Sequence, residues 1–298
     1  MKRRTPELAV AVALLSVTAV RELRAEPQRA NLSLGVRFGA STAPFYTAAF
    51  PSVRGHGFVA VLSGSYPITA MDELGLVLPG ALVSVEQPAG AYVDEVTWGN
   101  PTLFAMRSQQ YDAGNGRTLR WFGRLGLSLP LAEHGAPGAL LANRALAVAS
   151  ALEAWRDQQS YFPGRLSLAP SGGIDFSSPP WKLEASIKLP FLFEVSDANL
   201  PEDSDAHAVG FAPVVHTGAN AQVAKWLIPS LSADLVINAV PPADGARSEI
   251  ETAQLVLRPA LSFPLSRVVV LSADFVAPIA GSLGGSTFSG SMLVATNW

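Results

Sequence analysis

One histidine and one aspartate have the side chains that acid–base chemistry requires. His216 and Asp234 lie in two neighbouring segments in which apolar residues alternate with polar ones, and serines are frequent around them. A serine, a histidine and an acid within hydrogen-bonding distance of one another would form a hydrolase site. However, no Gly-x-Ser-x-Gly motif surrounds a candidate nucleophile. We therefore favour a structural histidine and expect no enzymatic activity, with a lipid-modifying enzyme as the alternative.

Other groups of residues contain the residue types of ligand-binding sites, but the surrounding sequence does not support such a site. The acidic segment with Glu202, Asp203 and Asp205 could bind a divalent cation, although a solvated loop is the favoured interpretation. The Gly-rich residues 281–285 precede an alternating segment and no helix, which argues against a phosphate loop. The chain has four His and no Cys, and their spacing indicates no zinc site. We expect no metal, no cofactor and, at a net charge of −3, no nucleic-acid partner.

Charged residues share faces with other polar residues along predicted strands. Successive side chains of a strand point to opposite faces, so alternation separates an apolar face from a polar one. Residues 181–195 show this well, because Leu183, Ile187 and Phe191 fall on the apolar face. Applied to the whole chain, the alternation predicts one shared polar face that includes Arg37, Arg120, Arg124, Asp175, Lys182, Glu184, Lys188, Glu194, Asp234, Arg258 and Asp274.

The elements that position these residues are about twelve strands and one helix. The strands are expected at residues 31–41, 58–67, 74–86, 102–111, 119–129, 165–176, 181–195, 208–224, 231–239, 253–263, 269–277 and 288–298. The long link 42–57 is expected to be a loop, and so is the link 87–100. Short links alternate with longer ones, as in barrels with short periplasmic turns and longer external loops. Residues 138–156 have helical periodicity, and the parity of the links places them outside.

The composition favours strands that face lipid. Mean hydropathy is +0.26, yet beyond the N-terminus no run approaches the roughly 20 apolar residues of a spanning helix. We predict an all-β fold, a transmembrane antiparallel up-and-down β-barrel of about 12 strands with one helix in an extracellular loop. The shared polar face would then line the lumen. Its mixed charges predict cross-strand ion pairs, and its excess of Arg and Lys favours anions in a polar pathway; the two interpretations are compatible.

The first residues have the composition of an export signal. Lys2, Arg3 and Arg4 precede the uncharged apolar residues 8–20, which are too few to span a bilayer as a helix. Ala25 is a plausible cleavage position. We therefore expect a signal peptide at residues 1–25 and a barrel at residues 26–298.

The C-terminal segment resembles bacterial outer-membrane β-barrels. Residues 251–298 contain three consecutive alternating segments, and the last one finishes at Trp298. In those barrels the last strand commonly ends in Phe or Trp and is read by the assembly machinery. The resemblance implies a location in the outer membrane of a Gram-negative cell. It also implies two partners, the outer-membrane lipids and the barrel assembly machinery, the latter through Trp298.

A second resemblance involves residues 98–103, with the sequence Trp-Gly-Asn-Pro-Thr-Leu. They are similar to the start of a strand in outer-membrane proteins of the aromatic-degradation and long-chain-fatty-acid-transporter type. The resemblance implies a monomeric barrel that passes hydrophobic compounds, often with a plug inside.

We expect an outer-membrane porin or transporter-like pore for small molecules, hydrophobic ones included. The alternatives are the lipid-modifying barrel enzyme and a structural or adhesive barrel with a closed lumen. The predicted helix carries an apolar stripe that needs burial, since an isolated helix of this length is marginal in water. We expect it to cap or constrict the external opening. The stripe consists of Leu141, Ala145, Val148, Leu152 and Trp155.

Overall fold

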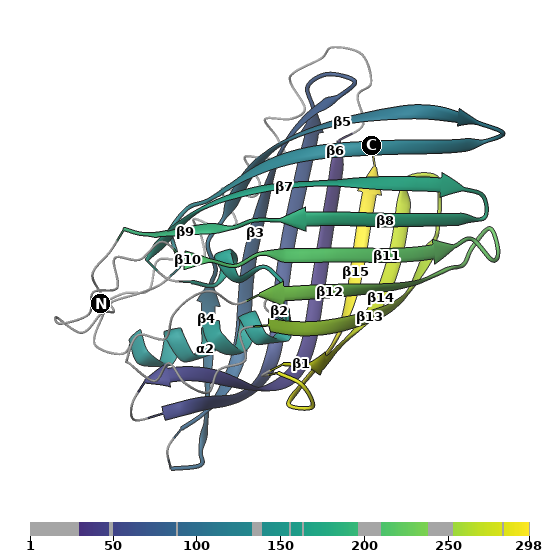
Figure 1. Ribbon diagram of the computed structural model, residues 1–298. Helices are drawn as coiled ribbons and strands as arrows, with labels where there is room; N and C mark the ends of the chain where they lie inside the picture. The colour runs from purple at the N-terminus through teal and green to yellow at the C-terminus, as the bar shows by residue number, and fades with distance from the viewer. Residues whose placement is uncertain are drawn as a thin grey trace.

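The chain forms an antiparallel sheet that closes on itself (Figure 1). The computed structural model describes residues 30–47, 50–87, 89–132, 139–154, 156–162, 164–195, 210–237, 253–281 and 283–297. The predicted signal peptide, the acidic segment around Asp203, Trp155 and Trp298 lie outside these residues. Twelve strands make the wall: β1 (Asn31–Thr47), β2 (Phe50–Pro67), β3 (Asp72–Glu86), β5 (Thr102–Gly114), β6 (Arg117–Ser128), β7 (Arg165–Ser178), β8 (Trp181–Lys188), β11 (Val214–Ala221), β12 (Ile228–Ile237), β13 (Ala253–Pro264), β14 (Val269–Ala280) and β15 (Thr287–Asn297).

The pairing of the first and last strands closes the barrel: β1 pairs with β15, with Asn31 opposite Asn297. The ring is continuous at β8 as well, which pairs with both β7 and β11. The predicted antiparallel barrel of twelve strands is thereby confirmed. The alternation of side chains along each strand separates an outer apolar face from an inner polar one, as β1 shows. Leu34 and Phe38 lie on the outside and are 48% and 51% exposed, whereas Arg37, between them in the sequence, lies inside and is 7% exposed.

Prolines interrupt the wall at three places. β4 (Tyr92–Trp98) pairs with one half of β3, and after Pro101 the chain continues as β5 along the other half. The predicted continuous strand 181–195 is wrong in detail, because it breaks before Pro190 into β8 and β9 (Phe191–Glu194). β10 (Gly210–Phe211) pairs with β9 and is separated from β11 by Pro213. Proline has no N–H to donate, so the ladder of hydrogen bonds is interrupted at each break.

Two predicted loops are shorter than expected. The prediction of a loop over the whole of residues 42–57 is wrong, because β1 and β2 remain paired there. The pairing continues from Thr42, opposite Arg54, to Pro44, opposite Ser52. The extension is stabilised from inside, because Val53 is fully buried in the same cluster as the helix described below. Similarly, the link expected at 87–100 contains β4.

The helix α2 (Ala139–Leu152) and the short 3-10 helix η1 (Gln158–Ser160) lie between β6 and β7. The predicted helix continued to residue 156, but α2 ends at Leu152 and Ala154 has a left-handed φ of 51°. Within the described chain, no helix is long and apolar enough to cross a membrane. Inside the barrel, α2 packs Val148 and Leu152 with wall residues Val59 and Val83, and all four side chains are fully buried.

The two ends of the barrel differ. The links between β2 and β3, β5 and β6, β7 and β8, β11 and β12, and β13 and β14 are tight turns at one end, which we call the short-turn end. The β5–β6 and β7–β8 turns lie on the right of Figure 1, and α2 lies toward the opposite end. Exposed Trp121 and Trp181 lie toward the short-turn end, and exposed Trp98 toward the other. Aromatic girdles of this kind flank the apolar band of membrane barrels.

Candidate functional site: a constricted lumen

Residues 153–162, here called the inward segment, follow α2 inside the barrel. Two wall side chains bind carbonyl groups where the helix ends: Ser289 Oγ donates to the Leu152 oxygen at 2.7 Å, and Arg258 Nη2 donates to the Glu153 oxygen at 2.9 Å. The last carbonyls of a helix have no partner within the helix and carry the negative end of its dipole. A hydroxyl and a guanidinium therefore stabilise the helix end against the wall.

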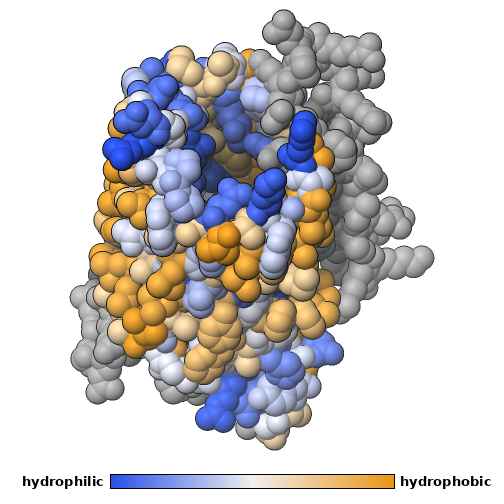
Figure 2. Space-filling model, turned by 90° about the vertical axis from the view of Figure 1, so that its right-hand side faces the viewer, coloured by the Kyte–Doolittle hydropathy of each residue, from blue (hydrophilic) through white to orange (hydrophobic). Residues whose placement is uncertain are grey.

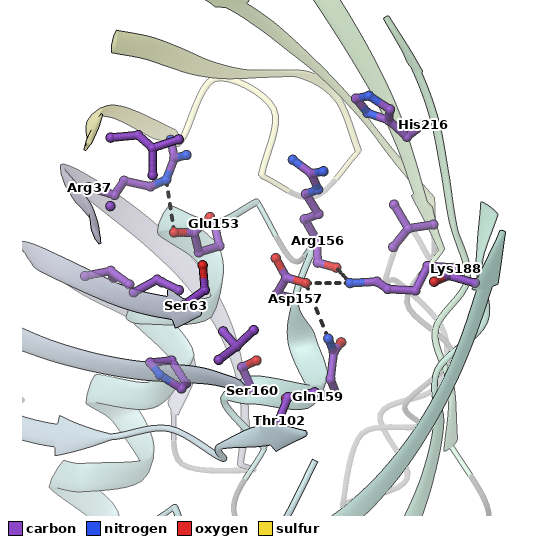
Figure 3. A pocket seen from close by; sticks show the side chains of 18 of the residues that line it. Arg37, Ser63, Thr102, Glu153, Arg156, Asp157, Gln159, Ser160, Lys188 and His216 are labelled. Carbon is purple, nitrogen blue, oxygen red and sulfur yellow. Dashed lines mark hydrogen bonds and ion pairs between the residues drawn. The ribbon is translucent and has the colours of Figure 1, made fainter. Parts of the chain in front are cut away.

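The same pattern continues along the inward segment. Gln254 Nε2 donates to the Ala154 carbonyl oxygen at 3.3 Å, and Lys188 Nζ donates to the Arg156 carbonyl oxygen at 2.5 Å. Lys188 also forms an ion pair with Asp157 at 2.6 Å, which Figure 3 shows. The backbone of the segment is thus attached to β8 and β13 by side chains rather than by strand pairing.

Ion pairs attach the segment to the opposite wall as well. Arg37 of β1 contacts Glu153 at 3.1 Å (Figure 3). It also contacts Asp274 of β14 at 3.0 Å. Burial alone would raise the pKa of Asp157, but Lys188 and Arg156 outweigh it and hold that pKa well below its usual range. The segment is therefore held across the lumen by ion pairs to β1 on one side and to β8 on the other.

Asn100, fully buried at the break between β4 and β5, binds both ends of the β6–β7 link. Its Nδ2 donates to the carbonyl oxygens of Gln159, at 3.1 Å, and Phe162, at 2.6 Å. Its Oδ1 accepts from the Ala132 N–H at 2.8 Å, and its own N–H donates to the Ser160 oxygen at 2.6 Å. All hydrogen-bonding groups of the side chain are used, so this one residue determines where the link enters and leaves the lumen.

Gly99, the residue before Asn100, leaves no room for a side chain. A Cβ on Gly99 would overlap the carbonyl oxygen of Ser160 and touch the ring of Pro79. The close approach of the inward segment to the wall therefore depends on the missing side chain.

A belt of alternating charges runs around part of the wall, from β6 to β13. Each member contacts the next one at 2.5 to 3.6 Å. Asp234 is fully buried, and Arg258 connects the belt to the inward segment. In order, the belt consists of Arg120, Asp175, Lys182, Glu184, His216, Asp234 and Arg258.

Both ring nitrogens of His216 are engaged by carboxylates. Nδ1 is 2.6 Å from Asp234 Oδ1, and Nε2 is 3.1 Å from Glu184 Oε1. A catalytic histidine of a Ser-His-Asp site needs one nitrogen facing the serine hydroxyl. In this structure His216 is instead one member of the belt.

A cavity of about 470 Å³ lies between the inward segment and the wall. On β2 and β3 its lining residues, such as Ser63 and Val77, are closer to the short turn than Val53 and Val85, which pack with α2. The cavity therefore lies on the short-turn side of the helix. Figure 2 faces the short-turn end and shows a hollow there with hydrophilic side chains, while hydrophobic residues cover much of the outer wall.

The residues predicted to share the polar face lie at several places in this site. Arg37, Arg124, Lys188 and Asp274 line the cavity. The side chain of Glu194, in β9, lies outside the described part of the structure. The remaining six belong to the belt: Arg120, Asp175, Lys182, Glu184, Asp234 and Arg258.

Sequence reasoning missed the residues that hold and form the inward segment. Asn100 lies within the motif at residues 98–103, but the motif by itself gives the side chain no role. Three charged residues between the helix and the next strand belong to this segment, but charged residues are equally typical of a solvated loop, so nothing in the sequence signals their role. They are Glu153, Arg156 and Asp157.

Comparisons with solved structures agree with this architecture. An outer membrane channel from Pseudomonas putida F1 is similar over 93% of this chain and 98% of its own, at 14% identity and a TM-score of 0.62. The transport unit of the autotransporter AIDA-I from Escherichia coli gives a TM-score of 0.49 at 10% identity, over 98% and 99% of the two chains. The NanC porin gives 0.44 at 6% identity, over 88% and 98%. No protein-family model and no curated protein matches the chain.

The chain has the fold of the outer-membrane β-barrels. Large apolar side chains exposed on the outside of the wall, such as Leu103, Leu125 and Leu231, need a lipid environment. Fold and surface together place the chain in an outer membrane.

Proposed function

We propose that the chain is a channel for small molecules and that the inward segment forms its narrowest part. The observation that carries this proposal is the anchoring of the inward segment across the lumen of the barrel, beside a cavity. Inside a small barrel whose only role is structural, side chains fill the interior. Here a cavity of about 470 Å³, lined by polar and apolar side chains, lies beside the anchored segment.

The lining suits molecules that have both polar and apolar parts. Ser63, Ser171 and Ser186 line the cavity together with the apolar residues Val61 and Met106. The predicted passage of hydrophobic compounds is compatible with the apolar groups, although the charged residues favour a molecule with a polar end. We propose no enzymatic role, and the position of His216 between two carboxylates supports this choice.

Two partners remain part of the proposal. Outer-membrane lipids would contact the exposed apolar side chains of the wall. Recognition by the barrel assembly machinery through the last strand stays a prediction from the sequence.

The test is to replace residues 138–160 with a short Gly/Ser link and to record single-channel currents in planar lipid bilayers. We expect the wild type to conduct and the variant to conduct more, because the segment occupies lumen that ions would otherwise use. The same link in place of the exposed turn 222–227 is the control and should leave the conductance unchanged. Absence of current from both proteins, with heat-modifiable gel migration showing folded barrels, would indicate a closed structural barrel.

A further inference from the structure

Arg156 places a charged group in the cavity without a fixed partner. It belongs to the inward segment, and its guanidinium lines the cavity. Figure 3 shows this side chain directed away from Lys188, which instead contacts Asp157. Within the described residues, no hydrogen bond or ion pair within 4 Å engages the guanidinium. Burial lowers its pKa, but Asp234, Asp157 and Glu153 outweigh burial and raise it, so that the group stays charged.

A second guanidinium lines the same cavity from the wall. Arg124 of β6 stacks on the ring of Phe104, with its Cζ 3.7 Å from the ring centroid. Among the described residues it forms no ion pair. Stacking uses the face of the guanidinium and leaves the N–H groups at its edge free to donate in the plane. This geometry holds the side chain in place while it keeps its donors available.

The charges around the cavity leave a cationic surplus. Its lining contains four cationic side chains and three carboxylates, His216 not counted. Arg37 pairs with Glu153 and Asp274, and Lys188 pairs with Asp157. The carboxylates of the lining are therefore all engaged by Arg37 and Lys188. Among the described residues, the guanidinium groups of Arg124 and Arg156 form no ion pair.

We propose that Arg124 and Arg156 form a binding site for a small organic anion that carries a carboxylate on an apolar body. Guanidinium groups bind carboxylates through paired, charge-assisted hydrogen bonds, which accounts for the anionic end. Val61, Val77 and Met106 line the same cavity and would contact the apolar body. A volume of about 470 Å³ is within the usual range for sites that bind small molecules. The inference rests on the proposed channel and names the class of molecule that it selects.

The test measures binding and conduction separately, with benzoate as the probe. Isothermal titration calorimetry of the detergent-solubilised barrel should show saturable binding of benzoate. Benzyl alcohol, which has the same ring without the charge, and acetate, which has the charge without the ring, should each bind at least about tenfold more weakly. In planar bilayers benzoate should reduce the chloride current through the wild type.

Arg124→Gln and Arg156→Gln should each weaken benzoate binding by at least about tenfold, because each removes a charge-assisted partner. Arg117→Gln is the matched control: Arg117 is an exposed arginine on β6 outside the cavity and should leave the affinity unchanged. Benzoate affinity that survives both cavity substitutions would overturn the site, and so would benzyl alcohol or acetate binding as tightly as benzoate.

The two proposals fail in different ways. A wild type that conducts ions but does not bind benzoate would refute the anion site and leave the channel in place. Binding of benzoate without any conductance would refute the channel and support the anion site.

Discussion

Arg258 donates a hydrogen bond of 2.9 Å from Nη2 to the carbonyl oxygen of Glu153, 105 residues earlier in the chain. Its Nε donates to Asp234 Oδ2 at 2.7 Å, and both side chains are buried. One guanidinium therefore joins the belt of charges on the wall to the end of α2. The position of the inward segment and the arrangement of the belt therefore depend on the same side chain.

Replacing Arg258 with Met should destabilise the barrel by about 3 kcal/mol. The substitution removes the guanidinium that contacts the buried Asp234 and leaves His216 as the remaining side chain paired with this carboxylate. Removing one partner of a buried ion pair is strongly destabilising, because the other charge stays buried. Urea unfolding of the refolded protein, followed by tryptophan fluorescence, measures the change. Arg267→Met, in an exposed turn, is the control and should stay within about 0.5 kcal/mol of the wild type. Equal stability of the two variants would show that the belt does not depend on Arg258.

Asn100→Asp should loosen the inward segment. A carboxylate has no N–H to offer the carbonyl oxygens of Gln159 and Phe162, so two buried acceptors lose their donor, at about 1–3 kcal/mol each. We expect larger current fluctuations in single-channel records and faster proteolysis within the β6–β7 link. Asn31→Asp, at an exposed position, tests the same chemical change without these contacts. Identical proteolysis of both variants would contradict the role assigned to Asn100.

Leu103→Arg should impair insertion into liposomes far more than Met106→Arg. Both residues belong to β5, but Leu103 is exposed on the outer wall, whereas Met106 lines the cavity. Leu103 lies between the levels of Trp98 and Trp121, and therefore near the middle of the bilayer. An arginine there costs about 2–4 kcal/mol. The folded fraction, read from heat-modifiable gel migration, is the measurement, and equal folding of the two variants would contradict the assigned faces.

Acid should release the inward segment only below the usual range of carboxylates. The pKa of Asp157 is depressed in the folded protein, so its stabilising contribution is complete above its ordinary value of 3.8 and declines as the pH falls through the lower, folded-state value. We expect wild-type conductance to stay constant from about pH 7 to about pH 4 and to rise below that. Asp157→Asn should show the raised conductance already near neutral pH, whereas Asp112→Asn, in an exposed turn, should follow the wild type. A rise between about pH 7 and pH 5 in the wild type would assign the acid response to other groups.

Strand alternation was enough to predict the wall. Residues such as Leu34 and Phe38 alternate with Arg37, and this period of two determines which side chains face lipid. The same signal failed at Pro190, because a break in the hydrogen-bond ladder leaves the alternation of apolar residues intact. It failed again at residues 42–57, where prolines and glycines suggested a loop although the two strands remain paired.

The site was harder to predict because its contacts join distant parts of the chain. The helix was predicted from its periodicity, and its need for a partner was clear. The partner is an apolar patch on the inner wall, formed by Val59, Val83 and Val85, and a model with an entirely polar inner face has no place for it. The hydrogen bonds from Ser289 and Gln254 to backbone carbonyls leave no pattern in the sequence at all.

The anchoring of the inward segment also has a mechanical consequence. The wall of a barrel can flatten under the lateral pressure of a bilayer unless contacts across the lumen resist a change of cross-section. Here Arg37 on one side and Lys188 on the other hold the same short segment, which acts as an internal strut between β1 and β8. The inward segment, which narrows the lumen, therefore also stabilises the cross-section of the barrel.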